Sequence, residues 1–244
     1  MLSQRGRQTK RSFYILAVLI PILLVSALFV VIGIAPFGSH NLLVSDLSTQ
    51  YLQFFAELKH QLAHFSFSGY SFLMSIGDSL VPIYAYYLLS PLNLIIMLFG
   101  TAQLPIAIDL IIWIKLILCS ISMSVFLAKK YQNYDLMAVY GGLAYGLCGF
   151  VAMYFYDLMW LDALIWLPVM VYGLEKLYYH GKPALYVVSL IMIIFTNFYM
   201  GYIICIFNVL YMAYLLKKNQ PYSLPFFQNL KANWQKISWF IWYS

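Results

Sequence analysis

Long apolar runs separated by short polar or basic links dominate this sequence of 244 residues. Four runs are each long enough to cross the roughly 30 Å hydrocarbon core of a bilayer as a helix. They occupy residues 12–34, 104–128, 136–155 and 162–179. A fifth run, 184–216, is too long for one span and has lysines at both ends, so it predicts a hairpin that turns near 197–201. The pattern therefore predicts about six spans.

The segment between the first two spans, 35–103, is predicted to form a first outer loop. Apolar side chains recur at helical spacing over 46–64, which predicts an amphipathic helix lying on the membrane. The stretch 80–99 is apolar, but it contains Pro82 and Pro91 and has to begin and end on the same side. It therefore predicts a re-entrant or interfacial pair of short helices, buried in protein or facing water.

The composition, 64% hydrophobic and 9% charged, has too few charges to cover a water-facing surface. Together with a mean hydropathy of +0.82, it predicts an all-α, polytopic transmembrane helical bundle. The net charge of +6 comes from basic clusters beside the apolar runs, which predict a cytoplasmic N-terminus and no nucleic-acid partner. The run from Ser12 exceeds the roughly 7–15 residues of a signal-peptide core, so we expect an uncleaved span.

Two regions are predicted along the chain. Residues 1–218 form the transmembrane helical domain. The tail 219–244 is polar as far as Lys236, and then a new apolar run begins at Ile237. We expect this tail to be a truncated continuation of a longer protein.

The acidic residues are unevenly distributed. Of the eight, Asp135 and Glu175 are predicted at the cytoplasmic side. The other six are predicted on or near the outer side: Asp46, Glu57, Asp78, Asp109, Asp157 and Asp162. Because acids contribute little to orientation, this skew indicates an outward-facing polar site.

Asp46, just past the exit of the first span, has two interpretations. It is a candidate helix N-cap, a common use of aspartate before an apolar-periodic helix, although Ser45 is able to do the same. It is also a candidate general base, because a carboxylate near an apolar surface has a raised proton affinity and can take a proton from an acceptor hydroxyl.

Asp157 and Asp162 flank a predicted second outer turn. Their spacing does not put them on one helical face. Two carboxylates on one short turn are candidates to bind a divalent metal or to orient an acceptor, and both are therefore catalytic candidates. The alternative is that one of them, Asp162 in particular, caps the following helix.

Lys115 lies near the middle of the span 104–128, where an unpaired ammonium costs about 2.5–3.5 kcal/mol. It therefore needs a partner, and a structural ion pair is one interpretation. Asp109, six residues earlier, points about 120° away on an ideal helix and is an awkward partner. The functional alternative is that Lys115 approaches a lipid phosphate as a substrate-binding residue.

Polar and aromatic side chains near the predicted turns are further candidates. Asn197 and Tyr199 lie in the hairpin turn, where turn formation and interface anchoring are the simpler explanations. Trp160 is a candidate for stacking on a sugar, with packing or interface anchoring as the alternative.

Several stretches resemble the bacterial YfhO family of membrane proteins. They are DLSTQY at 46–51, AYYLLSPLNL at 85–94, GFV at 149–151, MWLDA at 159–163 and NFYMGY at 197–202. The resemblance covers about residues 12–218, in order. Family members are much longer, so the chain resembles their N-terminal part.

The family resembles the type C glycosyltransferases, so the resemblance implies the N-terminal part of that fold in a multi-pass protein of the bacterial cell membrane. It implies transfer of a sugar from a polyprenyl-phosphate donor to a cell-envelope polymer such as teichoic acid, with membrane lipid as a further partner. By similarity Asp46 corresponds to the first-loop acid, and Asp157 or Asp162 to a second outer acid. Gln50 and Tyr51, in the same motif as Asp46, become substrate-binding candidates. The resemblance leaves the cofactor open, with a divalent metal as a candidate.

Two other functions fit the same sequence. A transporter or flippase for a lipid-linked sugar suits the interrupted helices at Pro82 and Pro91 and the buried Lys115. In a non-catalytic membrane scaffold, the outer acids would be helix caps.

Overall fold

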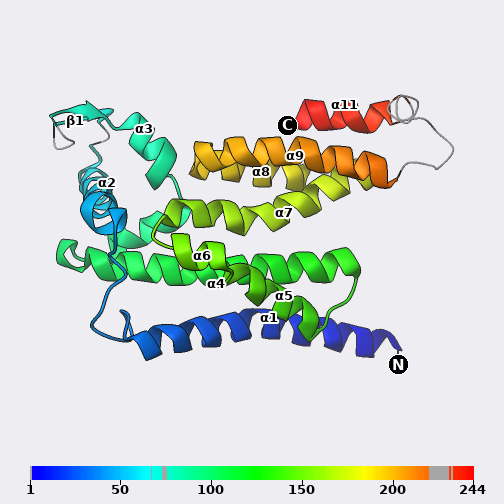
Figure 1. The fold of residues 1–244 in the computed structure, drawn as a ribbon, viewed down its shortest axis with the longest axis horizontal. Helices are drawn as coiled ribbons and strands as arrows, with labels where there is room; N and C mark the ends of the chain where they lie inside the picture. Colours follow the sequence, from blue (N-terminus) through cyan, green and yellow to red (C-terminus); the bar gives the residue numbers. More distant parts are fainter. Residues whose placement is uncertain (1, 67, 73–75, 220–230, 232) are drawn as a thin grey trace.

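The computed structural model of the chain describes residues 2–66, 68–72, 76–219, 231 and 233–244. Most of these residues form long helices that run lengthwise in one bundle (Figure 1). The helices of the bundle are α1 (Leu2–Ile32), α4 (Leu104–Tyr131), α5 (Leu136–Gly146), α6 (Gly149–Tyr154), α7 (Leu158–His180), α8 (Ala184–Thr196), α9 (Phe198–Lys218) and α11 (Trp234–Tyr243).

The described part of residues 35–103 forms a separate layer at one end of the bundle, here called the end layer (Figure 1). Its helices are η1 (Leu47–Tyr51), α2 (Leu52–His64), α3 (Val81–Ile83), η2 (Tyr84–Leu88), η3 (Pro91–Leu98) and η4 (Thr101–Gln103). A small antiparallel hairpin joins β1 (Tyr70–Ser71) and β2 (Asp78–Ser79), with Tyr70 opposite Ser79.

The predicted all-α membrane architecture is confirmed. Within the described residues, five helical segments are long and apolar enough to cross a membrane: 10–32, 101–131, 136–154, 158–180 and 198–218. The bent pair 81–88 and 91–98 makes a sixth if it is counted as one span. α8 is apolar but shorter, with 13 residues.

The two ends of the bundle differ in charge. The chain's N-terminus, the end of α4, the α7–α8 link and the end of α9 lie together at one end (Figure 1), which we call the basic end because it carries residues such as Lys10, Lys129 and Lys176. The end layer and the start of α7 lie at the other end, the acidic end. The six acids predicted on one side belong to the end layer or lie at or near the beginning of α4 and α7, whereas Asp135 and Glu175 belong to the basic end.

Close contact between α4 and α5 depends on two glycines. A Cβ at Gly142 would overlap Ser124 Oγ and the carbonyl oxygen of Ser120, and a Cβ at Gly146 would overlap Ser120 Oγ. The two backbones can therefore approach only because these positions carry no side chain, as in other small-residue crossings between membrane helices.

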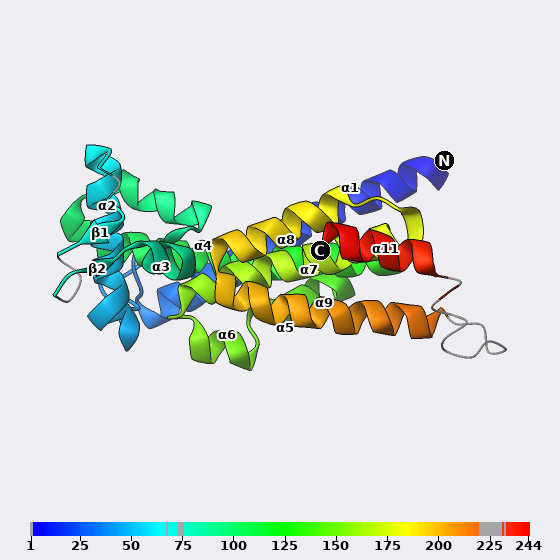
Figure 2. The ribbon, with the colours of Figure 1, turned by 90° about the horizontal axis from the view of Figure 1, so that it is seen from above.

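The predicted helix over 46–64 is confirmed as η1 followed by α2. α2 lies across the axis of the bundle (Figure 2), as expected for an amphipathic helix at a membrane surface. Phe55 and Leu58 face the core, and Lys59 Nζ donates hydrogen bonds to the carbonyl oxygens of Ile96 (3.1 Å) and Phe99 (2.5 Å). These two hydrogen bonds link α2 to the end of η3.

The predicted break within 80–99 is also present. η2 and η3 meet at an angle of 93° between Leu88 and Pro91. Ser90, the residue before Pro91, has extended backbone, which is the conformation that a following proline favours.

Three predicted boundaries differ from the structure. The run 136–155 is divided into α5 and α6 at Leu147 and Cys148. α7 begins at Leu158 rather than at Asp162, so the predicted turn over 156–161 is shorter than expected. The hairpin within 184–216 turns at Asn197 alone, where the backbone becomes extended between α8 and α9.

Candidate functional site

Asp46 lies at the entrance to η1 in the acidic end. Its side chain is exposed and makes no capping hydrogen bond. Its backbone is already helical (φ −63°, ψ −24°), whereas an N-cap residue that uses its side chain has extended backbone. The capping interpretation of Asp46 is therefore wrong. Ser45, with φ of 49°, contributes its carbonyl oxygen, which accepts from the Ser48 amide and hydroxyl.

The loop before Asp46 is fixed by a buried carboxylate. The Leu42 amide donates a 2.9 Å hydrogen bond to Asp109 Oδ1. Asp109, on α4, is 0% exposed, and its Oδ2 has no hydrogen-bond partner among the described residues. Asp109 thus anchors the approach to Asp46 and is not the partner of Lys115.

Asp157, the residue before α7, is held by Tyr51 of the end layer. The Tyr51 hydroxyl donates a 2.8 Å hydrogen bond to Asp157 Oδ1, and both residues are buried. The Tyr51 ring packs against the Tyr87 ring with centroids 5.1 Å apart. The Asp46 motif and the second acidic turn, far apart in sequence, therefore meet in one place.

The surroundings of Asp157 raise the pKa of its carboxyl group. Burial raises the pKa of Asp157 above its usual range, the hydrogen bond from Tyr51 lowers it, and the nearby charge of Asp46 raises it. Burial, followed by the hydrogen bond to Asp157, raises the pKa of Tyr51, so its hydroxyl remains a donor at neutral pH. The charge of Asp46 thus acts on the ionisation of Asp157.

Lys115 and Asp162 form a buried ion pair between α4 and α7. Lys115 Nζ lies 2.5 Å from Asp162 Oδ2 and donates a second hydrogen bond of 2.9 Å to the Leu158 carbonyl oxygen. The other oxygen of Asp162 accepts from Ser90 Oγ at 2.7 Å. The ion-pair interpretation of Lys115 matches this geometry. The capping interpretation of Asp162 is wrong, because α7 starts at Leu158 and the carboxylate points to Lys115 and Ser90.

Asn197, Trp160 and Tyr199 gather around Tyr86 of η2. Asn197 Nδ2 donates to the Tyr86 carbonyl oxygen (2.8 Å), and Asn197 Oδ1 accepts from the Met200 amide (2.7 Å). Trp160 Nε1 donates to the Tyr86 hydroxyl at 3.3 Å. The rings of Trp160 and Tyr199 stack with centroids 6.3 Å apart. Asn197 therefore both caps α9 and ties the hairpin to the end layer.

The predicted site residues fall into three places. The first place is the hydrogen bond between Tyr51 and Asp157, in the region of Asp46. The second is the ion pair between Lys115 and Asp162. The third is the group formed by Trp160, Asn197 and Tyr199 around Tyr86. The Gln50 side chain is exposed on η1 and takes no part in the hydrogen bonds described above. Ser90 and Tyr86 were not predicted to have a role, although both lie in the motif 85–94.

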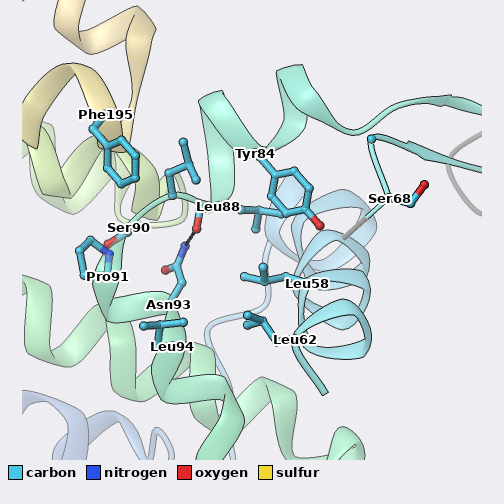
Figure 3. Close-up of a pocket in the computed structure, with 12 residues that line it drawn as sticks. Leu58, Leu62, Ser68, Tyr84, Leu88, Ser90, Pro91, Asn93, Leu94 and Phe195 are labelled. Atoms are coloured by element: carbon cyan, nitrogen blue, oxygen red, sulfur yellow. Dashed lines mark hydrogen bonds between the residues drawn. The ribbon is translucent and has the colours of Figure 1, made fainter. Parts of the chain in front are cut away.

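An apolar cavity of about 580 Å³ adjoins the second place. Leu58 and Leu62 of α2 line one side, and Leu88, Pro91 and Phe195 line the other (Figure 3). Ser90 lines the cavity and also donates to Asp162. The cavity thus opens beside the buried polar network.

The described residues do not form a complete metal site. No three His, Cys, Asp or Glu side chains within that part of the chain gather as a metal centre would require. Asp157 is held by Tyr51 and Asp162 by Lys115, so the two predicted ligands face different partners. We therefore derive no chemical step through a metal.

The fold defines the chain as a polytopic α-helical membrane protein. Its buried polar networks concentrate where the end layer meets one end of the bundle. The sequence model of the family described as bacterial membrane protein YfhO matches residues 17–244. Since this match covers most of the chain, the chain belongs to that family. The match also includes the tail, beyond residue 218 where the predicted resemblance stopped. No curated protein and no solved structure matched the chain in the comparisons.

Proposed function

We propose that this protein is a membrane glycosyltransferase that transfers a sugar from a polyprenyl-phosphate donor to a hydroxyl of a cell-envelope polymer such as teichoic acid. One observation carries the proposal: the segment that begins at Asp46 and the turn that contains Asp157 are distant in sequence but meet at the acidic end, where the Tyr51 hydroxyl donates to Asp157. Two carboxylates at the water–lipid boundary suit a reaction on a head group whose tail stays in the bilayer.

In this mechanism the exposed carboxylate of Asp46 takes the proton from the acceptor hydroxyl. The hydroxyl oxygen then attacks the anomeric carbon of the donor sugar, the bond from that carbon to the phosphate oxygen breaks, and polyprenyl phosphate leaves. Asp157 positions the acceptor through its carboxyl group. A general base of this kind contributes about 10²–10⁴-fold to the rate.

Lys115 does not contact the leaving phosphate in this proposal. It is 0% exposed, and its ammonium is engaged by Asp162 and by a carbonyl oxygen. Releasing it from Asp162 would leave a buried carboxylate unpaired, which is costly. Its role is to hold the start of α7, and therefore Asp157, against α4.

The apolar cavity is the proposed place for the carrier's first isoprene units. Five leucines, Pro91 and Phe195 supply its apolar lining, and Ser90 connects it to the polar network (Figure 3). The acidic end would face the outside of the cell, because the lysine-rich basic end fits the cytoplasmic side.

The second candidate is a flippase for a lipid-linked sugar, favoured by the 93° break between η2 and η3, since interrupted helices also line transport paths. Reconstituted vesicles separate the two functions, because a transferase moves label to an acceptor and a flippase moves labelled donor across the bilayer. A scaffold would do neither.

The test is Asp46→Asn in the full-length protein, with sugar incorporation into the envelope polymer and membrane abundance measured together. We expect incorporation to fall by at least about 100-fold at unchanged abundance. Asp78→Asn is the matched control, because Asp78 is also an exposed acid of the end layer but lies in the β hairpin. Full incorporation by Asp46→Asn would remove Asp46 from the mechanism.

A further inference from the structure

Among the basic-end lysines that lie over tyrosine rings, Lys10, Lys129 and Lys176 form two groups near α1 and the end of α4. Lys10 Nζ is 4.7 Å from the centroid of Tyr134. Lys129 Nζ and Lys176 Nζ lie 5.7 Å and 4.7 Å from the centroid of the same ring, Tyr172. A ring face attracts an ammonium but accepts no strong hydrogen bond, so the N–H groups of these lysines remain available to a ligand.

The two lysine–tyrosine groups belong to one surface. Phe13 of α1 packs with Ala128 of α4 and Val139 of α5, which brings the basic ends of these helices together. The Tyr14 ring lies 6.1 Å from the Tyr134 ring. Lys129 follows Ala128 on α4 and lies over Tyr172 of α7, so it connects the packed end of α1 to the second group. We call Lys10, Tyr14, Lys129, Tyr134, Tyr172 and Lys176 the basic aromatic cluster.

The two acids of the basic end are already engaged. Glu175 Oε1 accepts from Lys130 Nζ at 2.7 Å and from the Tyr211 hydroxyl at 2.6 Å. Asp135 accepts from the Ala138 amide, as the N-cap of α5, and from Asn133 Nδ2. Among the described residues, the three lysines of the cluster therefore have no ion-pair partner.

An apolar groove begins beside the cluster. It has a volume of about 450 Å³ and runs between α1 and the start of α5. Phe13, Leu16 and Val139 supply apolar lining, whereas Tyr134 and Asp135 lie at its polar part. The Asp135 side chain accepts from the Ala138 amide at the N-terminus of α5. The positive end of the helix dipole partly neutralises this carboxylate, so it repels a neighbouring anion less strongly.

We infer that the basic aromatic cluster binds the phosphate of an anionic phospholipid whose acyl chain lies in this groove. The lysines neutralise the phosphate, the tyrosine hydroxyls donate hydrogen bonds to its oxygens, and the apolar lining accommodates the chain. A free phosphate would leave the groove unused, so the ligand is a lipid. The site is separate from the acidic end and does not depend on the proposed transferase activity.

The test uses the full-length chain in detergent micelles, titrated with phosphatidylglycerol while tryptophan fluorescence reports the thermal unfolding midpoint. We expect phosphatidylglycerol to raise the midpoint, and phosphatidylcholine or inorganic phosphate at equal concentration to leave it unchanged. In the triple variant K10Q/K129Q/K176Q the concentration for half of the effect should rise by roughly 100-fold, since each lysine near an anionic lipid contributes roughly fivefold.

Two matched variants complete the test. Lys218→Gln removes a lysine that also lies over a ring, Tyr214, at the same end but outside the cluster, and it should respond as the parent does. K129R/K176R keeps both charges and should retain the response. The inference is overturned if the triple variant responds at the parent's concentration, if phosphatidylcholine is equally effective, or if inorganic phosphate alone reproduces the shift.

Discussion

The hydroxyl of Tyr51 donates a 2.8 Å hydrogen bond to Oδ1 of Asp157, which connects the end layer to the start of α7. This bond favours the ionised carboxylate, whereas burial and the charge of Asp46 oppose it. Besides burial, two side chains therefore act on the pKa of Asp157, and Tyr51 and Asp46 can be changed one at a time.

Tyr51→Phe removes the one interaction in this balance that lowers the pKa of Asp157. Its pKa should then rise further, so a larger fraction of Asp157 is protonated at any given acidic pH. If the ionised form supports transfer, the acid limb of the pH profile of kcat/KM should move to higher pH. Tyr84→Phe is the control, because its hydroxyl donates to Gln61 rather than to Asp157. An unmoved acid limb in Tyr51→Phe would separate Asp157 from the observed ionisation.

Lys115→Met should destabilise the protein strongly. It leaves the carboxylate of Asp162 buried without its cation, a change that costs about 3–5 kcal/mol. The double variant Lys115→Met with Asp162→Leu should recover part of that loss, since both charges are then absent. Unfolding by increasing sodium dodecyl sulfate in mixed micelles measures the difference.

Lys130→Met provides the comparison for that experiment. Its partner Glu175 has a side chain that is 14% exposed and also accepts from Tyr211, so water and Tyr211 can compensate for the lost lysine. We expect a smaller loss than for Lys115→Met. Equal losses would contradict the importance that we give to burial of the Lys115 pair.

Gly142→Ala should separate α4 from α5. The new methyl group would overlap Ser124 Oγ and the Ser120 carbonyl oxygen, and overpacking of this kind costs about 1–3 kcal/mol. Gly149→Ala is the matched control, since nothing lies within 4 Å of a Cβ at that position. Thermal unfolding in micelles should show a clear decrease for the first variant and little change for the second. Equal midpoints would mean that the two helices do not cross this closely.

The two hydrogen bonds of the Asn197 side chain, one that caps α9 and one to Tyr86, can be tested separately. Asn197→Ala removes both the cap on the Met200 amide and the donor to the Tyr86 carbonyl oxygen, at about 1 kcal/mol each. Asn197→Ser keeps a side-chain oxygen that can cap α9 but has no amide to donate to Tyr86, so its stability should lie between those of the parent and Asn197→Ala. A serine variant as unstable as the alanine variant would assign the whole effect to the link with Tyr86.

The membrane architecture could be predicted because it depends on the length and summed hydrophobicity of each segment of the chain. Apolar length located the spans that became α1, α4 and α9, and Pro91 located the 93° break. The start of α7 could not be predicted in this way. Asp162 looked like a boundary because it is charged, but a lysine on another helix allows it to lie inside the span.

The sequence suggested candidate residues for the site, but it did not predict their contacts. Nothing in the sequence identifies Asp162 as the partner of Lys115, because that pairing depends on how α4 and α7 face each other. The same holds for Tyr51 and Asp157. The capping interpretation of Asp46 failed for a local reason, since the positive φ of Ser45 turns the chain before Asp46 and leaves Asp46 in helical backbone.

The ion pair between Lys115 and Asp162 also has a consequence for biosynthesis. The ribosome makes Lys115 47 residues before Asp162, so α4 leaves the translation machinery while its neutralising partner is still missing. A lone ammonium is expensive in lipid. We therefore expect α4 to bear the cost of an unpaired ammonium until α7 has been made, and the pair to close only when α7 packs against α4.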